Sequence, residues 1–118
     1  PEPYNNDPRD LCNMSFEDFY KRIDVMMGNV ARLIKKSDHE NKRYHPIIFV
    51  VGTHRNGKEG IFDMDVEFQN IAKSYNWKLW DKQFLETNNP HLVCSLQRNF
   101  EFKFVHKNYE TSLVFVKF

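Results

Sequence analysis

The spacing of apolar residues predicts a long α-helix in the first third of the chain. Six apolar residues recur at intervals of three and four, which places them on one face of a helix: Phe16, Phe19, Ile23, Met27, Val30 and Ile34. Ser15 can cap the first turn, and Asp18 completes a capping-box pattern three residues later. Lys35 and Lys36 then supply the positive charge that favours a helix C-terminus. The segment therefore predicts a helix that lays one apolar face on a core.

An apolar run from Ile47 to Val51 predicts the strand around which the rest of the chain is organised. The run shows no alternation of apolar and polar residues, which is typical of a strand buried on both faces in a parallel sheet. It stops at Gly52, after which the chain turns polar and basic. Parallel sheets bind ligands at the carboxyl ends of their strands, so we expect function in the loop from Gly52 to Gly60.

The pattern after this loop predicts one more helix and three strands. The helix would begin near Asp63 or Asp65 and bury four residues: Val66, Ile71, Ala72 and Tyr75. Partial alternation predicts a strand from Trp77 to Leu85. Further on, alternating phenylalanines and a closing apolar segment predict an antiparallel hairpin made of Phe100 to Phe104 and Ser112 to Phe118.

Helices that alternate with strands imply right-handed crossover connections. The predicted fold class is therefore α/β, with parallel strands, crossover helices and an antiparallel hairpin at one edge. With 118 residues, 41% of them hydrophobic, the chain can bury one core. Residues 1–118 are thus expected to form a single domain or part of one.

Composition and charge narrow the function classes only slightly. A net charge of +1 neither requires nor excludes a polyanionic partner, so nucleic-acid binding would need a local basic patch. Cys12 and Cys94 lack metal-ligand spacing, and we expect them to be reduced thiols in a cytoplasmic protein. No apolar run is long enough to cross a bilayer. The chain opens on Pro1, from which we expect that the start of the natural chain is missing.

The loop after the central strand is similar to a phosphate-binding loop without meeting its requirements. Gly52 to Lys58 matches seven positions of that motif, but the eighth, which must be Ser or Thr to hold magnesium, is Glu59. The next predicted helix also begins too late for its N-terminus to face a phosphate. We therefore expect an ordinary functional loop that presents His54 and Arg55 to a ligand. A solvated loop with a surface cation explains these two residues about as well.

Other candidate groups carry weaker signals. Capping of a helix explains Asp63 and Asp65 more simply than acid–base catalysis does. The row of alternating phenylalanines fits the core face of a hairpin better than a platform for stacking bases. No metal site is expected, because four histidines lie in separate segments without ligand spacing: His39, His45, His91 and His106.

Several short segments follow one another in an order that is similar to a known enzyme family. They are Pro1–Asn6, Asp7–Leu11, Ser15–Phe19, Arg32–Lys35, Phe49–Gly52, Ala72, Tyr75–Leu79, Asp81 and His106–Lys117. In these segments the chain resembles the DNA amino-methyltransferases, which use S-adenosylmethionine to methylate the exocyclic nitrogen of adenine or cytosine. The resemblance covers nearly the whole chain. It implies a partial Rossmann-like methyltransferase sheet, DNA as the partner, and a role in DNA methylation such as restriction–modification.

The resemblance also implies site residues. In this family a tetrapeptide of Asp, Asn or Ser followed by Pro-Pro-Tyr receives a base flipped out of the duplex. Its polar side chain and a proline carbonyl accept hydrogen bonds from the target amino group, while the aromatic ring stacks on the base. Pro3 and Tyr4 match the last two positions and would be the catalytic residues. His54, Arg55 and Lys58 would contact DNA or support the site.

Two departures from the family pattern leave alternatives open. Pro1 stands where the polar acceptor belongs, and Glu2 replaces the first proline. The glycine-containing motif and the acidic residue that bind S-adenosylmethionine are not found, so the chain resembles the target-side half of a domain. A second subunit or the missing half would then pair with its sheet. The alternatives are a degenerate, non-catalytic methyltransferase-like subunit or DNA-binding module, and a nucleotide-phosphate binder that uses Gly52 to Lys58.

Overall fold

The computed structural model describes residues 6–56, 60–86 and 109–118 of the chain. Along the described residues a short 3-10 helix is followed by two α-helices and five strands. Their bounds are η1 (Leu11–Asn13), α1 (Phe16–Leu33), β1 (Ile47–Val51), β2 (Thr53–Asn56), β3 (Gly60–Asp63), α2 (Met64–Ser74), β4 (Lys78–Glu86) and β5 (Tyr109–Val116). In the part of the chain that is described, no helix has the length and apolar character needed to cross a membrane.

α1 forms as its sequence predicts, apart from its last residues. The Ser15 hydroxyl accepts a hydrogen bond from the backbone amide of Asp18 at 3.2 Å, which confirms the predicted cap. The predicted apolar stripe faces the core, where Ile23 and Met27 are buried. The helix ends at Leu33, so Lys35 and Lys36 lie beyond it and the basic residue of its last turn is Arg32.

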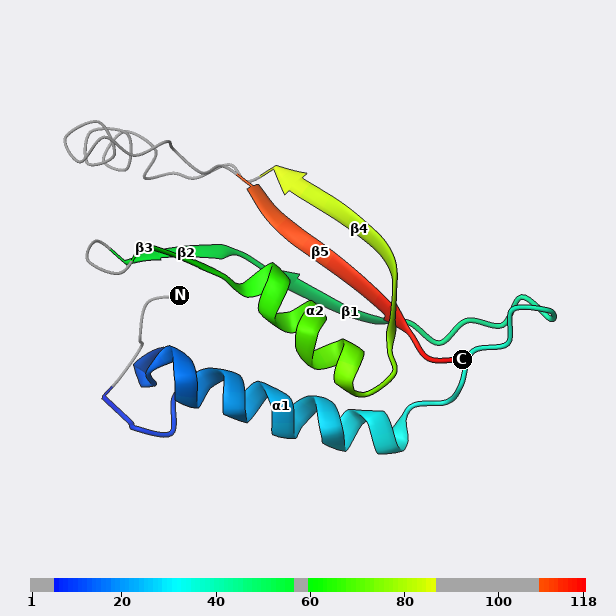
Figure 1. Cartoon of the computed structure of the whole chain (residues 1–118), viewed down its shortest axis with the longest axis horizontal. Coiled ribbons are helices and arrows are strands. Elements are labelled where there is room, and N and C mark those ends of the chain that lie inside the picture. Colours follow the sequence, from blue (N-terminus) through cyan, green and yellow to red (C-terminus); the bar gives the residue numbers. More distant parts are fainter. Residues whose placement is uncertain (1–5, 57–59, 87–108) are drawn as a thin grey trace.

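β5 lies in the middle of a three-stranded sheet with the order β1-β5-β4 (Figure 1). Both neighbours pair with β5 in the antiparallel direction. Ile47 of β1 lies opposite Phe115, and Lys78 of β4 lies opposite Val116. β1 and β4 therefore run in the same direction, on either side of a strand that runs against both. Because every strand pairing in the described residues is antiparallel, the parallel Rossmann-like sheet stays a prediction. The segment 100–104, with its predicted hairpin, lies outside the described residues.

Both helices pack on one face of this sheet and build a single core with it. α1 contributes Ile23 and Met27, α2 contributes Phe68 and Ala72, and the sheet supplies Val51, Leu113 and Phe115, with Trp77 between α2 and β4. On the other face, Ile48 and Val50 of β1 are 59% and 54% exposed. The prediction that this strand is buried on both faces is therefore wrong for the described chain, because no second layer covers β1 there.

α2 begins at Met64, where a helix start was predicted, but it buries a different set of residues. Ala72 is fully buried and Phe68, which the prediction omitted, is nearly so, whereas Val66 is 47% exposed. Phe68 and Ala72 are four residues apart and share one helix face, while Val66 is two residues away from Phe68 and lies on another. The prediction for Val66 is wrong because the sheet selects the face that carries the larger aromatic side chain.

Candidate functional site at the carboxyl end of the first strand

The chain forms a β-hairpin directly after β1, which sequence reasoning missed. β2 pairs antiparallel with β3, so that His54 lies opposite Phe62 and Arg55 lies opposite Ile61. Lys58, between the two strands, lies outside the described residues. The hairpin is joined to the end of β1 through a single residue, so the structure places His54 and Arg55 close to the carboxyl end of that strand, as expected.

The same hairpin argues against a phosphate-binding loop. Such a loop curls its backbone amides around an anion and leads straight into a helix. Here residues 53–56 are an extended strand paired along their length, and the helix begins only at Met64. The backbone of residues 53–56 is therefore arranged as a strand ladder, whereas Lys58 and Glu59 lie outside the described residues.

The start of α2 carries two carboxylates with different roles. Asp63 occupies the N-cap position but makes no side-chain capping hydrogen bond, so capping by its carboxylate is a wrong prediction. Asp65 forms an ion pair with Lys82 of β4 at 2.6 Å and accepts a hydrogen bond from Gln69. The Asp65 side chain is only 14% exposed, so this pair is less screened by water than an ordinary surface pair. Its structural role is to tie α2 to β4.

The N-terminal end of α1 lies against the hairpin. The ring of Phe16, the first residue of α1, stacks on Phe62 of β3 with centroids 4.0 Å apart and an interplanar angle of 13°. This offsets the exposure of two large rings and fixes the hairpin to the helix. The segment that leads into α1 is thereby brought to the same end of the molecule as β2 and β3 (Figure 1).

Asp7 organises the turn that leads into η1 and α1. Its Oδ1 accepts a hydrogen bond from the backbone amide of Arg9 at 2.9 Å, and its carbonyl accepts one from the amide of Asp10 at 3.0 Å. The Arg9 guanidinium lies 2.7 Å from Asp7 Oδ2, and its hydrogen bonds hold the pKa of Asp7 below the usual value. Pro3 and Tyr4, which precede this turn, lie outside the described residues.

Tyr20 of α1 has a shielded hydroxyl near the start of α2. This oxygen is buried and has no hydrogen-bond partner among the described residues. Burial raises the pKa of Tyr20 above 10.0, and the nearby Glu67 and Asp63 carboxylates act in the same direction. The side chain is therefore a neutral hydrogen-bond donor at pH 7. Sequence reasoning missed it because a tyrosine beside an apolar stripe shows nothing unusual.

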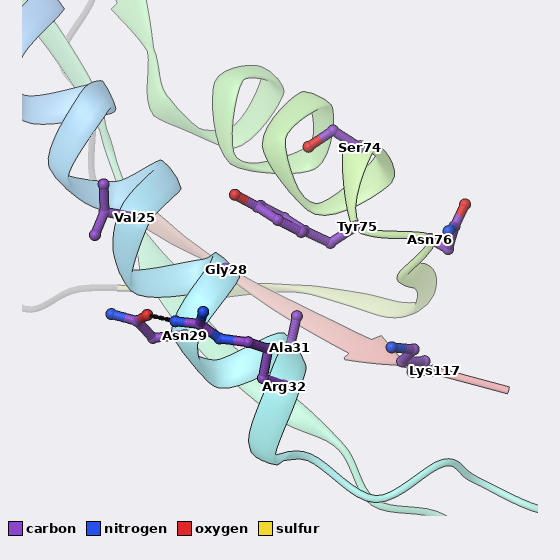
Figure 2. A pocket seen from close by; sticks show the side chains of 9 residues that line it. All are labelled: Val25, Gly28, Asn29, Ala31, Arg32, Ser74, Tyr75, Asn76 and Lys117. Carbon is purple, nitrogen blue, oxygen red and sulfur yellow. Dashed lines mark hydrogen bonds between the residues drawn. The ribbon is translucent and has the colours of Figure 1, made fainter.

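A separate cavity of about 570 Å³ lies between α1, the turn after α2 and Lys117 (Figure 2). Tyr75 points from the turn toward α1, where its hydroxyl donates hydrogen bonds to Asp24 Oδ1 at 2.7 Å and to the Asp24 carbonyl at 3.1 Å. The bond to the Asp24 carboxylate raises the pKa of Tyr75. Gly28 permits this approach, because a Cβ there would lie 2.8 Å from the Tyr75 oxygen. None of the predicted site residues lines this cavity.

The side chains of the described residues do not form a metal-binding group. No three His, Cys, Asp or Glu residues among them gather closely enough to hold an ion. Three described segments make up the candidate site, and all lie at one end of the molecule: the β2–β3 hairpin, the turn at Asp7 and the start of α2.

The described fold has a counterpart among solved structures. No family model matches the chain, and no curated protein sequence matches it. A crystal structure of a proposed DNA modification methylase from Thermus thermophilus matches with a TM-score of 0.63 at 16% sequence identity. The match covers 86% of this chain and 38% of the methylase chain, so this chain spans less than half the length of that protein. At this level of identity the match shows a shared fold.

Proposed function

We propose that this chain forms the target-base side of an S-adenosylmethionine-dependent DNA amino-methyltransferase domain. The observation that carries the proposal is the shared fold with part of a DNA modification methylase, over 86% of the chain. Tyr4 would stack on a base flipped out of the duplex, and the Pro3 segment would shape the loop that accepts the amino group. His54, Arg55 and Lys58 would contact the DNA backbone near that base.

The position of the described segments supports this assignment. The turn at Asp7, which directly follows the proposed base-accepting residues, lies at the same end of the molecule as the β2–β3 hairpin. A flipped base and the phosphates beside it need contacts from neighbouring segments. Residues 3–4 and 54–58 are far apart in sequence. The contact between Phe16 and Phe62 joins α1, which follows the first segment in the chain, to β3, which follows the second.

The open edge of the described sheet supports a chain that forms only part of a domain. β1 pairs on one side only in the described residues, so its other edge presents backbone groups that a further strand can bind. Ile48 and Val50 are exposed on the adjoining face. We propose that the cofactor-binding part of the domain, in the same polypeptide or in a second subunit, completes this edge and face.

The second candidate is a non-catalytic methyltransferase-like subunit or DNA-binding module. The observation that favours it is the sequence of the base-accepting segment, in which Pro1 and Glu2 replace the polar acceptor and the first proline. Such a chain would still bind DNA through the hairpin. It would not transfer a methyl group, because the target nitrogen would lack the acceptor that aims its lone pair at the donor.

Calorimetric titration with S-adenosylmethionine, with and without duplex DNA, separates these two candidates. Binding followed by transfer of a labelled methyl group to DNA would establish the enzyme, and transfer should be lost in Tyr4→Ala. A folded chain that binds duplex DNA but neither binds nor uses the cofactor would be the non-catalytic form, or would need its other half. A chain that binds neither ligand would contradict both candidates.

The role of Tyr4 can be measured without the cofactor. Placing 2-aminopurine at a mismatched position in a duplex lowers the free energy needed to flip that base. The fluorescence of 2-aminopurine reports whether the base is stacked. Loss of ring stacking is worth about 1–3 kcal/mol per base, so Tyr4→Ala should weaken binding of this duplex by about 5- to 100-fold. The matched variant Tyr4→Phe keeps the ring and should bind as the unmodified chain does. Equal binding by the alanine and phenylalanine variants would exclude base stacking by Tyr4.

A further inference from the structure

Four aromatic rings form a cluster at the end of the sheet opposite the hairpin. We call His39, Tyr44, Trp80 and Phe118 the aromatic cluster. Ring centroids are 5.4 Å apart for Tyr44 and Trp80 and 5.5 Å apart for Trp80 and Phe118. His39 meets all three edge-on at 5.9–6.3 Å, and its Nδ1 shares a hydrogen bond of 2.8 Å with the Tyr44 hydroxyl. Three segments distant in sequence thus meet at one surface.

Three of the four rings in the aromatic cluster are exposed and Tyr44 is half-buried, and an irregularity in β4 contributes to the exposure of Trp80. Trp80 is 44% exposed and Phe118 is 42% exposed. The register between β4 and β5 shifts between Leu79 and Asp81, so Trp80 has no partner in β5. A bulge of this kind re-aims a side chain away from the regular face of a strand, and such bulges are frequent next to functional sites. Grouped, exposed large rings are typical of surfaces that bind a partner.

Hydrogen bonds hold the loop that carries two of these rings. The amide of Ser37 donates to the carbonyl of Lys117 at 2.5 Å, and the Ser37 hydroxyl accepts from the amide of His45 at 2.9 Å. Asp38 and Arg43 exchange backbone hydrogen bonds of 2.7 and 2.9 Å across the tip of the loop. The rings are therefore positioned before any ligand arrives, which reduces the entropy lost on binding.

Positive charge is concentrated in the segments that build the cluster. Residues 35–45, 78–80 and 117–118 contain six cations and two carboxylates, whereas the whole chain carries a net charge of only +1. The six are Lys35, Lys36, Lys42, Arg43, Lys78 and Lys117, of which Lys117 lines the separate cavity beside Gly28. Lys78 Nζ lies 5.8 Å from the centre of the Phe118 ring. Among the described residues, none of the six takes part in an ion pair. These segments thus carry a local excess of positive charge, which a near-neutral chain would need to bind a polyanion.

We propose that the aromatic cluster and its surrounding cations bind single-stranded nucleic acid. Sites for single-stranded nucleic acid combine exposed aromatic rings with lysine and arginine side chains. Bases stack on the rings, and the cations contact the phosphates. A duplex keeps its bases paired and would leave the rings unused, and an acidic peptide would use the charge alone. The surface lies at the amino ends of β1 and β4, away from the hairpin to which the proposed function assigns the target base (Figure 1).

Fluorescence anisotropy with a labelled 20-nucleotide oligo(dT) tests the proposal at several salt concentrations. The oligonucleotide should bind more tightly than a duplex of equal length, and its affinity should fall as salt rises. Trp80→Ala should weaken binding by about 5- to 100-fold, the range expected for one lost stacking contact. Each lost phosphate contact removes about 0.7 from the slope of log affinity against log salt. The double variant Lys42→Glu/Arg43→Glu should therefore lower that slope by about 1.4.

A matched charge change elsewhere provides the control. Arg22 and Lys73 are exposed cations on α1 and α2, and Arg22→Glu/Lys73→Glu changes the net charge by the same amount as the loop variant. This control should retain most of the binding. Circular dichroism and thermal melting of each variant show that it is folded, and Trp80→Tyr, which keeps a stacking ring, should bind better than Trp80→Ala.

The position of the bound strand distinguishes this proposal from the proposed function. Photo-cross-linking with an oligonucleotide that carries 5-iodouracil should yield adducts on Tyr44, Trp80 or Phe118. Adducts confined to residues 52–63, equal losses in the loop variant and the control, or no binding of oligo(dT) at low salt would each overturn it. Tighter binding of the duplex together with an unchanged affinity of Trp80→Ala would also overturn it, because binding would then depend on charge alone.

Discussion

The two faces of the β1-β5-β4 sheet differ in what covers them. On one face, two helices cover Leu113 and Phe115 of the central strand, which are at most 1% exposed. On the other face, Ile48 and Val50 of β1 are more than half exposed, although they belong to the same apolar run as their buried neighbour Val51. An uninterrupted apolar strand is typical of a strand covered on both sides. The difference shows that an uninterrupted apolar run did not by itself set burial on both faces: in the described residues only the face of β1 under the helices is covered.

The helix-covered face should contribute most to stability. Leu113 is fully buried at the centre of the core, and Leu113→Ala leaves a cavity that costs about 2–5 kcal/mol. Chemical denaturation should therefore show a large fall in the free energy of unfolding. Leu79→Ala in β4, where the leucine is 37% exposed, provides the comparison in the same sheet. Equal losses for the two substitutions would contradict the described difference in burial.

The contact between α1 and the turn after α2 should come next in size. In Gly28→Ala the new methyl group would lie 2.8 Å from the Tyr75 hydroxyl oxygen, which hydrogen bonds to Asp24 hold in place. Overpacking of this kind costs about 1–3 kcal/mol, and the better helix propensity of alanine returns about 1 kcal/mol. We expect a net loss of about 1 kcal/mol in thermal or chemical unfolding.

A double-mutant cycle separates this contact from other effects of the alanine. Tyr75→Phe removes the oxygen that the methyl group meets. In that background Gly28→Ala should cost less than it does in the unmodified chain. If the two costs are equal, the contact between Gly28 and Tyr75 does not determine the helix packing.

The hydroxyl of Tyr20 should make stability depend on alkaline pH. Burial raises its pKa in the folded chain above 10.0, so above pH 10 the unfolded chain releases this proton before the folded chain does. The free energy of unfolding should fall as pH rises from 10 through the raised folded pKa, and the contribution is fully present below pH 10. Tyr20→Phe should show a smaller fall between pH 9 and pH 11 than the unmodified chain. Parallel pH profiles would show that the hydroxyl is not shielded.

The exposed face should give the smallest effect. Ile48→Thr keeps a β-branched side chain in β1 and changes a residue that is 59% exposed. In the described chain alone it should change the free energy of unfolding by less than about 0.5 kcal/mol. A loss above about 1.5 kcal/mol would mean that this face is covered in solution, and analytical ultracentrifugation would then show whether a second copy covers it.

The candidate site shows how far sequence reasoning reached. The apolar run that stops at Gly52 predicted the end of β1 within one residue, but the loop predicted from Gly52 to Gly60 is wrong for residues 53–56, which form β2. The hairpin itself escaped prediction because β2 and β3 are each four residues long and have no apolar alternation of their own. The hairpin packs on α1 through the stacked rings of Phe16 and Phe62, which are far apart in sequence. The proposed roles of all five site residues stay predictions: Pro3, Tyr4, His54, Arg55 and Lys58.

The sequence by itself determined the helix α1 and the strands β1 and β5 of this protein. Ser15 starts α1, the apolar stripe through Ile23 and Met27 selects its buried face, and apolar runs specify β1 and β5, because capping and hydrophobic periodicity act between neighbours in the chain. Only the tertiary structure decided which strands pair, which face of β1 is covered, and that Trp80 joins His39 in one cluster. These depend on contacts between segments far apart in sequence, and no local pattern encodes them.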